Sequence, residues 1–338
     1  MANRLFDTAN LRKLITPGRR MIKLNFESCL VTGGAGFIGS HICSEALEQG
    51  LRVVCLDNLV SGNEDNMIHL NSNPNFTFIK ADVSDLDSIL PYFGNIDVVF
   101  HNAASKNTVC RIDPRLDLDV NAWGAWCVAE ASRLSGVKKL VHASTGSVYG
   151  ELVVRPQSEN HPLNPRSFYG VSKLAGERYL GAFAAYYPDF RFSIIRYYHV
   201  FGSRQSHADT GGVIPIFVRQ ALNGGPITIN GDGSQIRSFT SVKDDVNANF
   251  ALANSTDADG RAFNAASSVK VSIQELAHKV RDILGVPETP ITYHPWRSGD
   301  ILDFDVDTSA LAELGVAFSV DFDEALTETV NWYRGLLT

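Results

Sequence analysis

Short apolar runs alternate with longer stretches of helical periodicity along the first two thirds of the chain. The apolar runs have the length of buried strands, and the stretches between them carry apolar residues at helical spacing. Alternation of this kind predicts an α/β fold with a doubly wound parallel sheet covered by helices on both faces. We expect strands at Cys29–Val31, Arg52–Leu56, Phe76–Ile79, Asp97–Phe100, Lys139–Ala143 and Phe192–Arg196, and helices at Ile38–Gln49, Asp85–Tyr92, Leu116–Ser135 and Phe168–Tyr187.

The pattern changes after residue 197, where glycine and proline separate shorter segments. Helices are expected at Asp244–Asn254 and Ile273–Leu284. This part of the chain reads as a smaller α/β domain that faces the first one. The sequence therefore predicts an N-terminal extension over 1–27, a first domain over 28–197 with a return segment at about 236–268, and a second domain over 198–338.

A glycine-rich turn follows the first predicted strand, where Thr32–Gly39 reads T-G-G-A-G-F-I-G. Gly33, Gly36 and Gly39 are spaced by three, and such positions lack a Cβ where a backbone must approach a phosphate or a neighbouring strand. The helix that begins at Phe37 and Ile38 offers free N–H groups and its positive dipole end to a pyrophosphate. The segment therefore predicts a dinucleotide site in a Rossmann-type domain.

Asp57 and Asn58 end the second predicted strand. A carboxylate at this place accepts hydrogen bonds from the ribose hydroxyls of the adenosine and repels a 2′-phosphate, which indicates NAD rather than NADP. The alternative is that Asp57 is an ordinary turn or helix cap.

Composition and charge narrow the function classes. The chain has 338 residues, of which 44% are hydrophobic, and a net charge of −7. An acidic chain is a poor partner for nucleic acid or a membrane surface, and no apolar run approaches the ~20 residues of a membrane span. Five cysteines without paired spacing indicate reduced thiols and a cytoplasmic protein. The first 23 residues are basic and favour a surface extension, with a transit peptide as the alternative.

Tyr169 and Lys173 lie four residues apart in a predicted helix and therefore on one helix face. An ammonium group beside a phenol favours the phenolate and can make it a base near neutral pH. The spacing alone is weak evidence, because a solvated helix face with a packed tyrosine looks the same. Upstream, hydroxyl groups at Ser144, Thr145 and Ser147 follow a predicted strand and would point into the ligand crevice.

Together these segments resemble the extended short-chain dehydrogenase/reductase family, and within it the nucleotide-sugar epimerases and dehydratases, most closely the UDP-glucose 4-epimerase type. The resemblance runs from about residue 28 to 335. It is carried by T-G-G-A-G-F-I-G-S-H (Thr32–His41), L-D-N-L (Leu56–Leu59), A-D-V (Ala81–Val83), H-N-A-A (His101–Ala104), S-T-G-S-V-Y-G (Ser144–Gly150), Y-G-V-S-K (Tyr169–Lys173), R-Y-Y-H-V-F-G (Arg196–Gly202), G-D-G-S-Q-I-R (Gly231–Arg237) and R-S-G-D (Arg297–Asp300).

The resemblance implies NAD as cofactor, a nucleotide-diphosphate sugar as substrate, no metal, and roles for named residues. The catalytic residues would be Thr145, Tyr169 and Lys173. The cofactor would be bound by Gly33, Gly36, Phe37, Ile38, Gly39, Asp57, Asn58, Asp82, Val83, Ala103, Ala104, Lys106, Ser144, Tyr169, Lys173 and Tyr197. The substrate would be bound by Lys106, Thr145, His199, Arg237, Arg297, Asp300 and Phe304, with both arginines on its diphosphate, although a surface ion pair is the alternative for each.

The residues beside Thr145 narrow the reaction within the family. Dehydratases and decarboxylases of the family carry acidic residues after the catalytic threonine, and this chain has Gly146 and Ser147 there. The resemblance then implies a 4-epimerase, which oxidises the sugar at C4 to a 4-keto intermediate and returns the hydride to the opposite face. A dehydratase or net oxidoreductase is the second hypothesis, and a non-enzymatic NAD-binding scaffold is the third.

Several positions leave the substrate open between UDP-hexose and UDP-hexuronic acid. His199 and Asn230 replace the asparagine and the aromatic residue that many relatives have, so His199 is either a polar partner or an added acid/base group, and uridine is in doubt. Phe304 should disfavour an N-acetyl group at C2. Arg111 could pair with a carboxylate, while Cys110 reads as a small apolar residue.

The helices at 116–135 and 168–187 carry apolar residues on more than one face. In relatives such helices form a four-helix contact between two subunits, so a homodimer is expected.

Overall fold

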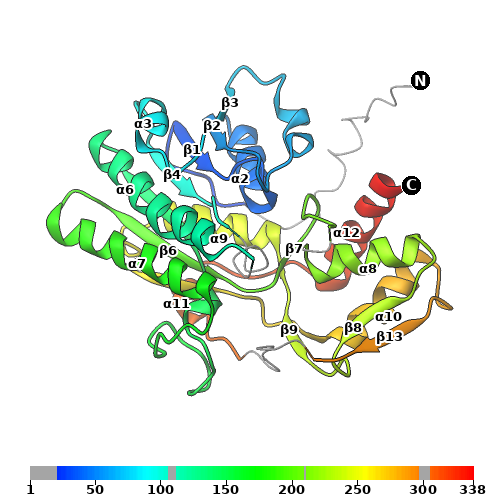
Figure 1. The fold of residues 1–338 in the computed structure, drawn as a ribbon. Helices are drawn as coiled ribbons and strands as arrows, with labels where there is room; N and C mark the ends of the chain where they lie inside the picture. Colours follow the sequence, from blue (N-terminus) through cyan, green and yellow to red (C-terminus); the bar gives the residue numbers. More distant parts are fainter. Residues whose placement is uncertain (1–20, 106–111, 209–210, 297–304) are drawn as a thin grey trace.

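The computed structural model describes residues 21–105, 112–208, 211–296 and 305–338. Its centre is a parallel sheet of seven strands (Figure 1) in the order β11-β6-β5-β4-β1-β2-β3. The strands are β1 (Ser28–Thr32), β2 (Arg52–Asp57), β3 (Phe76–Lys80), β4 (Val98–His101), β5 (Lys139–Thr145), β6 (Phe192–Tyr197) and β11 (Ala262–Ala265). The direction of winding reverses between β1 and β4, and ligands of such sheets bind at the carboxyl ends of the strands beside this point.

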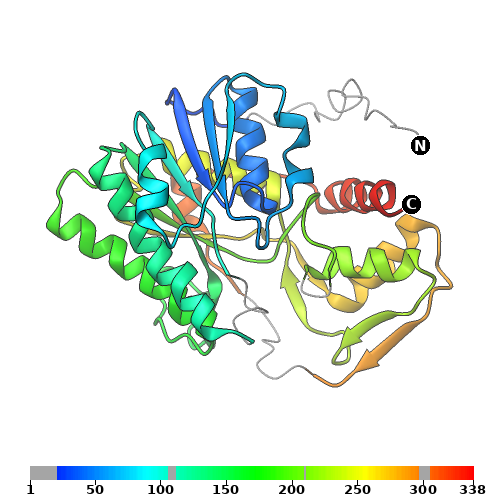
Figure 2. The ribbon, with the colours of Figure 1, turned by 45° about the horizontal axis from the view of Figure 1, so that its top comes forward.

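Helices cover both faces of the sheet, so its central strands are buried on both sides, while the edge strand β3 stays partly exposed (Figures 1 and 2). One face packs against α2 (Phe37–Glu48) and α9 (Val242–Asn254), and their apolar residues join those of β1, β2 and β6 in one core cluster. The other face packs against α3 (Leu86–Ile89), α6 (Gly124–Leu134) and α7 (Phe168–Tyr186), which share a second cluster. Burial on both faces explains why the strands read as continuous apolar runs rather than as alternating ones.

A third apolar cluster lies beside the sheet, in the lower right of Figure 2. It holds α8 (Val213–Leu222), α10 (Ile273–Leu284) and α12 (Phe322–Leu337) together with the parallel strands β8 (Ile227–Asn230) and β13 (Ile291–His294). Short pairs join β9 (Ile236–Ser238) to β12 (Lys270–Ser272) and β7 (Val200–Phe201) to β10 (Thr240–Ser241). Helix α10 begins with Ser272 accepting a hydrogen bond from the Glu275 amide and ends at Gly285 in a left-handed conformation, so its bounds agree with the sequence.

The predicted doubly wound α/β fold is confirmed, and most predicted elements differ from the observed ones by one or two residues at their ends. The helix expected over 116–135 is wrong as a single regular helix. It consists of α5 (Pro114–Asp117), a six-residue π-helical segment η4 (Leu118–Trp123) and α6. The helix expected over 85–92 is likewise α3 followed by the 3₁₀ turn η3 (Leu90–Tyr92), because Pro91 lacks the amide proton that a regular turn needs.

Residues 21–27 lie across α2 and α9. The Ile22 amide donates to Asn247 Oδ1 at 2.7 Å, and the Leu24 amide donates to Gln49 Oε1 at 2.8 Å. Among the described residues, no helix has the length and apolar character that crossing a membrane requires.

Candidate cofactor and catalytic site

A cleft of about 720 Å³ opens at the carboxyl ends of β1, β2 and β4. Every predicted cofactor residue in the described part of the chain lines it: Gly33, Gly36, Phe37, Ile38, Gly39, Asp57, Asn58, Asp82, Val83, Ala103, Ala104, Ser144, Tyr169, Lys173 and Tyr197. Lys106 lies outside the described residues. The fold therefore gathers in one cleft residues that lie at or just after the ends of six strands and residues on two helices.

The glycine turn at the floor of this cleft has no room for side chains. Gly33 has a φ of 66°, and a Cβ there would lie 2.7 Å from the Ala103 amide nitrogen. A Cβ at Gly39 would lie 2.2 Å from the Gly33 carbonyl oxygen. Helix α2 starts at Gly36 without a side-chain cap, so its first amides remain available to an anion. This geometry is that of a cradle for a phosphate group.

Asp57 ties the end of β2 to the glycine turn. Its Oδ2 accepts a hydrogen bond from the Ala35 amide at 3.0 Å and its Oδ1 accepts one from the Leu59 amide at 2.8 Å. Burial raises the pKa of this carboxyl group, and the two amides oppose that rise. Both oxygens keep a lone pair for a further donor. Asn58 bridges to Asp82 of the next strand through Nδ2 and Oδ2 at 2.7 Å.

Helix α7 carries Tyr169 and Lys173 into the cleft. Ser167 caps the helix by accepting a hydrogen bond from the Gly170 amide. A Cβ at Gly170 would lie 2.6 Å from the Ser147 carbonyl oxygen, so glycine lets the start of α7 lie directly against the segment after Thr145. The structure thus places Tyr169 on a segment adjacent to that of Thr145.

The Lys173 side chain is fully enclosed. Its exposed fraction is 1%, and its Nζ atom has no hydrogen-bond partner among the described residues. Burial lowers the pKa of Lys173 to about 8, against the attraction of Glu177 and Asp117. A buried ammonium that faces a cleft without a partner is a group prepared for a ligand.

A buried polar network lies beneath Lys173. Arg196 and Glu177 form a two-point ion pair, with distances of 2.9 Å from Nε to Oε1 and 2.6 Å from Nη2 to Oε2. Arg196 also donates to the Tyr149 hydroxyl, and Ser144 donates to Glu177 Oε1 at 2.5 Å. The network fixes the ends of β5 and β6 relative to α7, and the predicted catalytic residues lie on two of these elements, β5 and α7.

Thr145 is surrounded by hydroxyl groups and glycine. The Ser147 amide donates to Thr145 Oγ1 at 3.2 Å, and Thr145 Oγ1 lies 3.3 Å from Ser147 Oγ. No carboxylate follows Thr145 in the chain before Glu151. The position can therefore supply hydrogen bonds but no acidic side chain of its own.

His199 and Arg237 lie near one another on the side of the third apolar cluster. Burial, together with the smaller effect of the Arg237 charge, lowers the pKa of His199 to about 3, so the imidazole is neutral at pH 7. A neutral imidazole favours the interpretation of His199 as a polar partner. The described lining of the 720 Å³ cleft does not include three of the predicted substrate or catalytic residues, which are Thr145, His199 and Arg237. The remaining substrate predictions, Arg297, Asp300 and Phe304, lie outside the described residues, as do Cys110 and Arg111.

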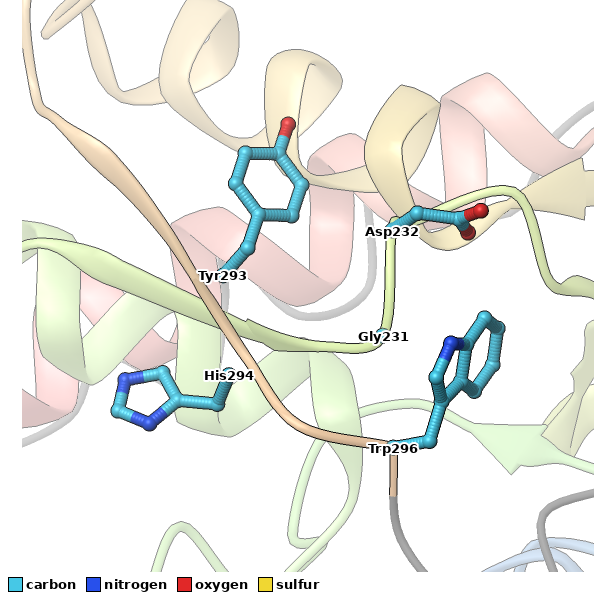
Figure 3. Close-up of a pocket in the computed structure, with 5 residues that line it drawn as sticks. All are labelled: Gly231, Asp232, Tyr293, His294 and Trp296. Atoms are coloured by element: carbon cyan, nitrogen blue, oxygen red, sulfur yellow. The ribbon is translucent and has the colours of Figure 1, made fainter.

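A shallow hollow of about 470 Å³ lies at the carboxyl ends of β8 and β13 (Figure 3). It is lined by Gly231, Asp232, Tyr293, His294 and Trp296. The Trp296 ring lies against Gly231, since a Cβ there would be 2.7 Å from three of the ring's atoms. The Trp296 ring thus lies beside the segment of Asn230, the position at which many relatives have an aromatic residue and this chain has an asparagine.

Sequence reasoning missed a second wall of the cleft, formed by Arg204, Trp332 and Leu336. Arg204 Nη1 donates to the Ser40 carbonyl at 3.0 Å and to Ser44 Oγ at 2.9 Å, and burial lowers its pKa to about 10. Arg204 lies two residues after the motif that ends at Gly202, and this short distance is a signal that the sequence contains. The C-terminal helix carries no sequence signal of its contact with the cleft.

The cleft fits a dinucleotide. The glycine turn leaves space for a phosphate, and Asp57 offers acceptors for hydroxyl groups. Lys173 Nζ, Asn102 Nδ2 and Ser105 Oγ are buried in its wall without a hydrogen-bond partner in the described structure. Ribose hydroxyls and phosphate oxygens are suitable partners for these three groups.

The fold and cleft define a dinucleotide-dependent enzyme of the Rossmann type. The sequence model of the NAD dependent epimerase/dehydratase family matches residues 29–266, and the chain belongs to this family. NAD is its cofactor.

Three relatives are informative. A UDP-glucose 4-epimerase of Mycolicibacterium smegmatis is 39% identical over 90% of this chain and 98% of its own length. The crystal structure of a Thermotoga maritima UDP-glucose 4-epimerase with UDP-glucose is 33% identical, with a TM-score of 0.86 over 92% of this chain and 100% of that one. The structure of a Bacillus cereus UDP-glucuronic acid 4-epimerase with UDP-glucuronic acid and NAD is 29% identical, with a TM-score of 0.84 over 91% and 99%.

Neither a reactive thiol nor a metal site is indicated among the described residues. Cys29, Cys43, Cys55 and Cys127 are buried free thiols, and burial raises the pKa of Cys29 to about 12. No group of three metal-binding side chains occurs among the described residues.

Proposed function

We propose that the protein is a nucleotide-sugar 4-epimerase that uses NAD without net oxidation of its substrate. One observation carries the proposal: Tyr169 and Lys173 lie in the NAD cleft next to the segment of Thr145, and that segment offers only hydroxyl groups and glycine. Groups of this kind can move a proton at a sugar hydroxyl, but they offer no carboxyl group to assist the loss of water. The similarity to UDP-glucose 4-epimerases supports the same reaction.

In the proposed reaction NAD supplies a reversible hydride acceptor. The Tyr169 oxygen takes the proton of the C4 hydroxyl, and Thr145 holds that hydroxyl by a hydrogen bond. The Lys173 ammonium stabilises the phenolate by its charge and binds the nicotinamide ribose. The 4-keto sugar then turns about its diphosphate, and Tyr169 returns the proton when the opposite face of C4 is reduced.

The substrate proposed is a UDP-hexose or a UDP-hexuronic acid. Arg237, with Arg297 from outside the described residues, would bind the diphosphate, and Lys106, His199, Asp300 and Phe304 would contact the substrate. Trp296 would stand beside the nucleobase, where Asn230 offers no ring. The UDP-glucose 4-epimerases among the relatives, 33% and 39% identical, support the hexose version, and the UDP-glucuronic acid 4-epimerase, 29% identical, supports the hexuronic version. We propose the domain division of the sequence analysis together with this function, the substrate lying between the two parts.

We also propose a homodimer through helices α6 and α7 and the segment η4, which lie side by side in Figures 1 and 2. Large apolar side chains are exposed on these elements: Leu118, Trp123, Phe168, Val171 and Tyr179. A second copy of the same surface would cover them, as a two-fold interface requires. Sedimentation at micromolar concentration should give twice the chain mass, and a monomer would reject the proposal.

The reaction is tested by incubating the protein with a panel of nucleotide sugars and following the anomeric signals by NMR. We expect interconversion of C4 epimers without accumulation of NADH. Tyr169→Phe should retain bound NAD and lose about 10²–10⁴-fold in kcat, the usual contribution of a general base. A product that has lost water would support the dehydratase hypothesis, and no reaction across the panel would support the scaffold.

A further inference from the structure

The residue after Thr145 lies against an aromatic ring. A Cβ built at Gly146 would be 2.4 Å from Cε1, 2.6 Å from Cζ and 3.0 Å from Cδ1 of Tyr198. Real Cβ atoms essentially never come this close to a neighbouring atom, so no residue other than glycine fits at position 146 while this ring keeps its place. The obstacle is one edge of a rigid aromatic ring rather than the end of a flexible side chain.

Tyr198 is held firmly. Its exposed fraction is 3%, and it packs with Val148, Tyr149 and Ala266 in a small core cluster. Its hydroxyl donates to Gln157 Oε1 at 2.6 Å. The backbone of Gln157 is itself fixed. Its backbone N–H donates to the backbone carbonyl of Asp305, and its backbone carbonyl accepts from the backbone N–H of Asp307. The ring therefore cannot swing aside without breaking contacts at both of its ends.

The position that Tyr198 closes is chemically important. After oxidation at C4, the sugar is a β-hydroxy ketone when C6 bears a hydroxyl. Water is lost from it when a base takes the C5 proton, the C5–H electron pair forms the C5–C6 double bond, and an acid protonates the departing C6 hydroxyl. Under the dehydratase hypothesis, an acidic side chain on the residue after Thr145 would take part in such a proton transfer. The hydroxyl groups of Thr145 and Ser147 are far weaker acids and bases at neutral pH.

We propose that Tyr198 is a specificity-determining residue, because its ring keeps the position beside Thr145 free of any side chain and so confines the site to oxidation and reduction at C4. This inference rests on the proposed function. It also predicts that residues 146 and 198 are coupled: a side chain at 146 is tolerated only when the ring at 198 is removed.

The test uses five purified proteins besides the wild type: Gly146→Ala, Gly146→Asp, Tyr198→Ala, the double variant G146D/Y198A, and Tyr198→Phe as the matched control. The Phe variant keeps the ring and loses only the hydroxyl, so it separates the effect of removing the ring from the effect of losing the bond to Gln157. Gly146→Ala should lower kcat by about 10²-fold, the scale of an ångström-sized misplacement of a catalytic group, with a much smaller change in KM. Gly146→Asp should lower bound NAD and the thermal midpoint further.

The double variant decides the proposal. In the Tyr198→Ala background, the added aspartate should no longer lower NAD content or the thermal midpoint. The kcat–pH profile of the double variant should gain an ionisation in the carboxyl range that Tyr198→Ala alone lacks. An equal penalty for Gly146→Asp in both backgrounds, or a pH profile without the new ionisation, would overturn the inference. If the wild type epimerises no nucleotide sugar, the proposed function fails, while NAD content and thermal midpoints still test the contact between Gly146 and Tyr198.

Discussion

Replacing Lys173 with methionine should abolish turnover and, in the cofactor-free protein, make the fold more stable. Methionine has a similar length and an apolar end, so it fills the same space without the buried charge. The ammonium group of Lys173 is enclosed and has no hydrogen-bond partner among the described residues. The free energy of unfolding of the wild type should therefore carry a penalty that the variant lacks.

The size and the pH dependence of this penalty follow from the pKa. Burial lowers the pKa of Lys173 from 10.5 to about 8. This difference corresponds to about 3 kcal/mol of folding free energy. Below pH 8 both the folded and the unfolded chains are protonated at this lysine, so the full penalty applies. Between pH 8 and 10.5 the folded chain has lost the proton and the unfolded chain still holds it, so the penalty shrinks with rising pH and vanishes above 10.5.

The assay is urea unfolding of protein freed of NAD, at pH 7, 8.5 and 9.5. We expect Lys173→Met to exceed the wild type by about 3 kcal/mol at pH 7, and the excess should fall steadily at the two higher pH values. Lys138→Met serves as the control, because Lys138 is exposed and paired with Asp97, so its loss should give no stabilisation. Two results would contradict this reasoning. One is a Lys173→Met variant that is less stable than the wild type at pH 7. The other is a difference in the free energy of unfolding that does not change with pH, because burial of the Lys173 charge would then not destabilise the folded chain.

Two other changes probe the cofactor cradle and the network beneath it. Gly33→Ala forces a side chain into a left-handed backbone position and against Ala103, so bound NAD per chain, measured by absorbance after denaturation, should fall to near zero; wild-type content would refute the cradle. Glu177→Gln leaves the Arg196 charge buried without its carboxylate, which should lower the free energy of unfolding by about 3–5 kcal/mol in urea. Asp119→Asn, in an exposed pair, should change it by less than about 1 kcal/mol, and similar losses for the two variants would contradict the argument.

The parts of this site that the sequence predicts are those set by local geometry. The glycine turn, Asp57 at the end of its strand, and the four-residue spacing of Tyr169 and Lys173 depend on neighbours in the chain. Contacts between segments that are distant in the chain leave no local pattern in the sequence from which they could be predicted. The C-terminal helix brings Trp332 to the cleft, and the Gly146–Tyr198 contact joins neighbouring strands, so both depend on how whole elements pack. The π-helical turn at 118–123 was equally hidden, since its residues suit a regular helix.

The cofactor side of the site contains buried polar groups without partners, whereas the side near Thr145 is closely packed. Both features bear on which reaction the site can carry out. On the cofactor side, Lys173, Asn102 and Ser105 keep buried polar atoms without partners in the described structure, at a cost of about 1–3 kcal/mol for each group. A dinucleotide that satisfies them gains this energy on binding, which favours a cofactor that remains in the cleft between turnovers. On the side of the proposed substrate, the ring of Tyr198 fills the space that a side chain at position 146 would need. In the proposed reaction a retained cofactor must return the hydride to the sugar it came from, and without an acid at position 146 that return is expected at C4. The unpaired groups under the cofactor and the packed ring beside residue 146 thus both support the proposed epimerisation.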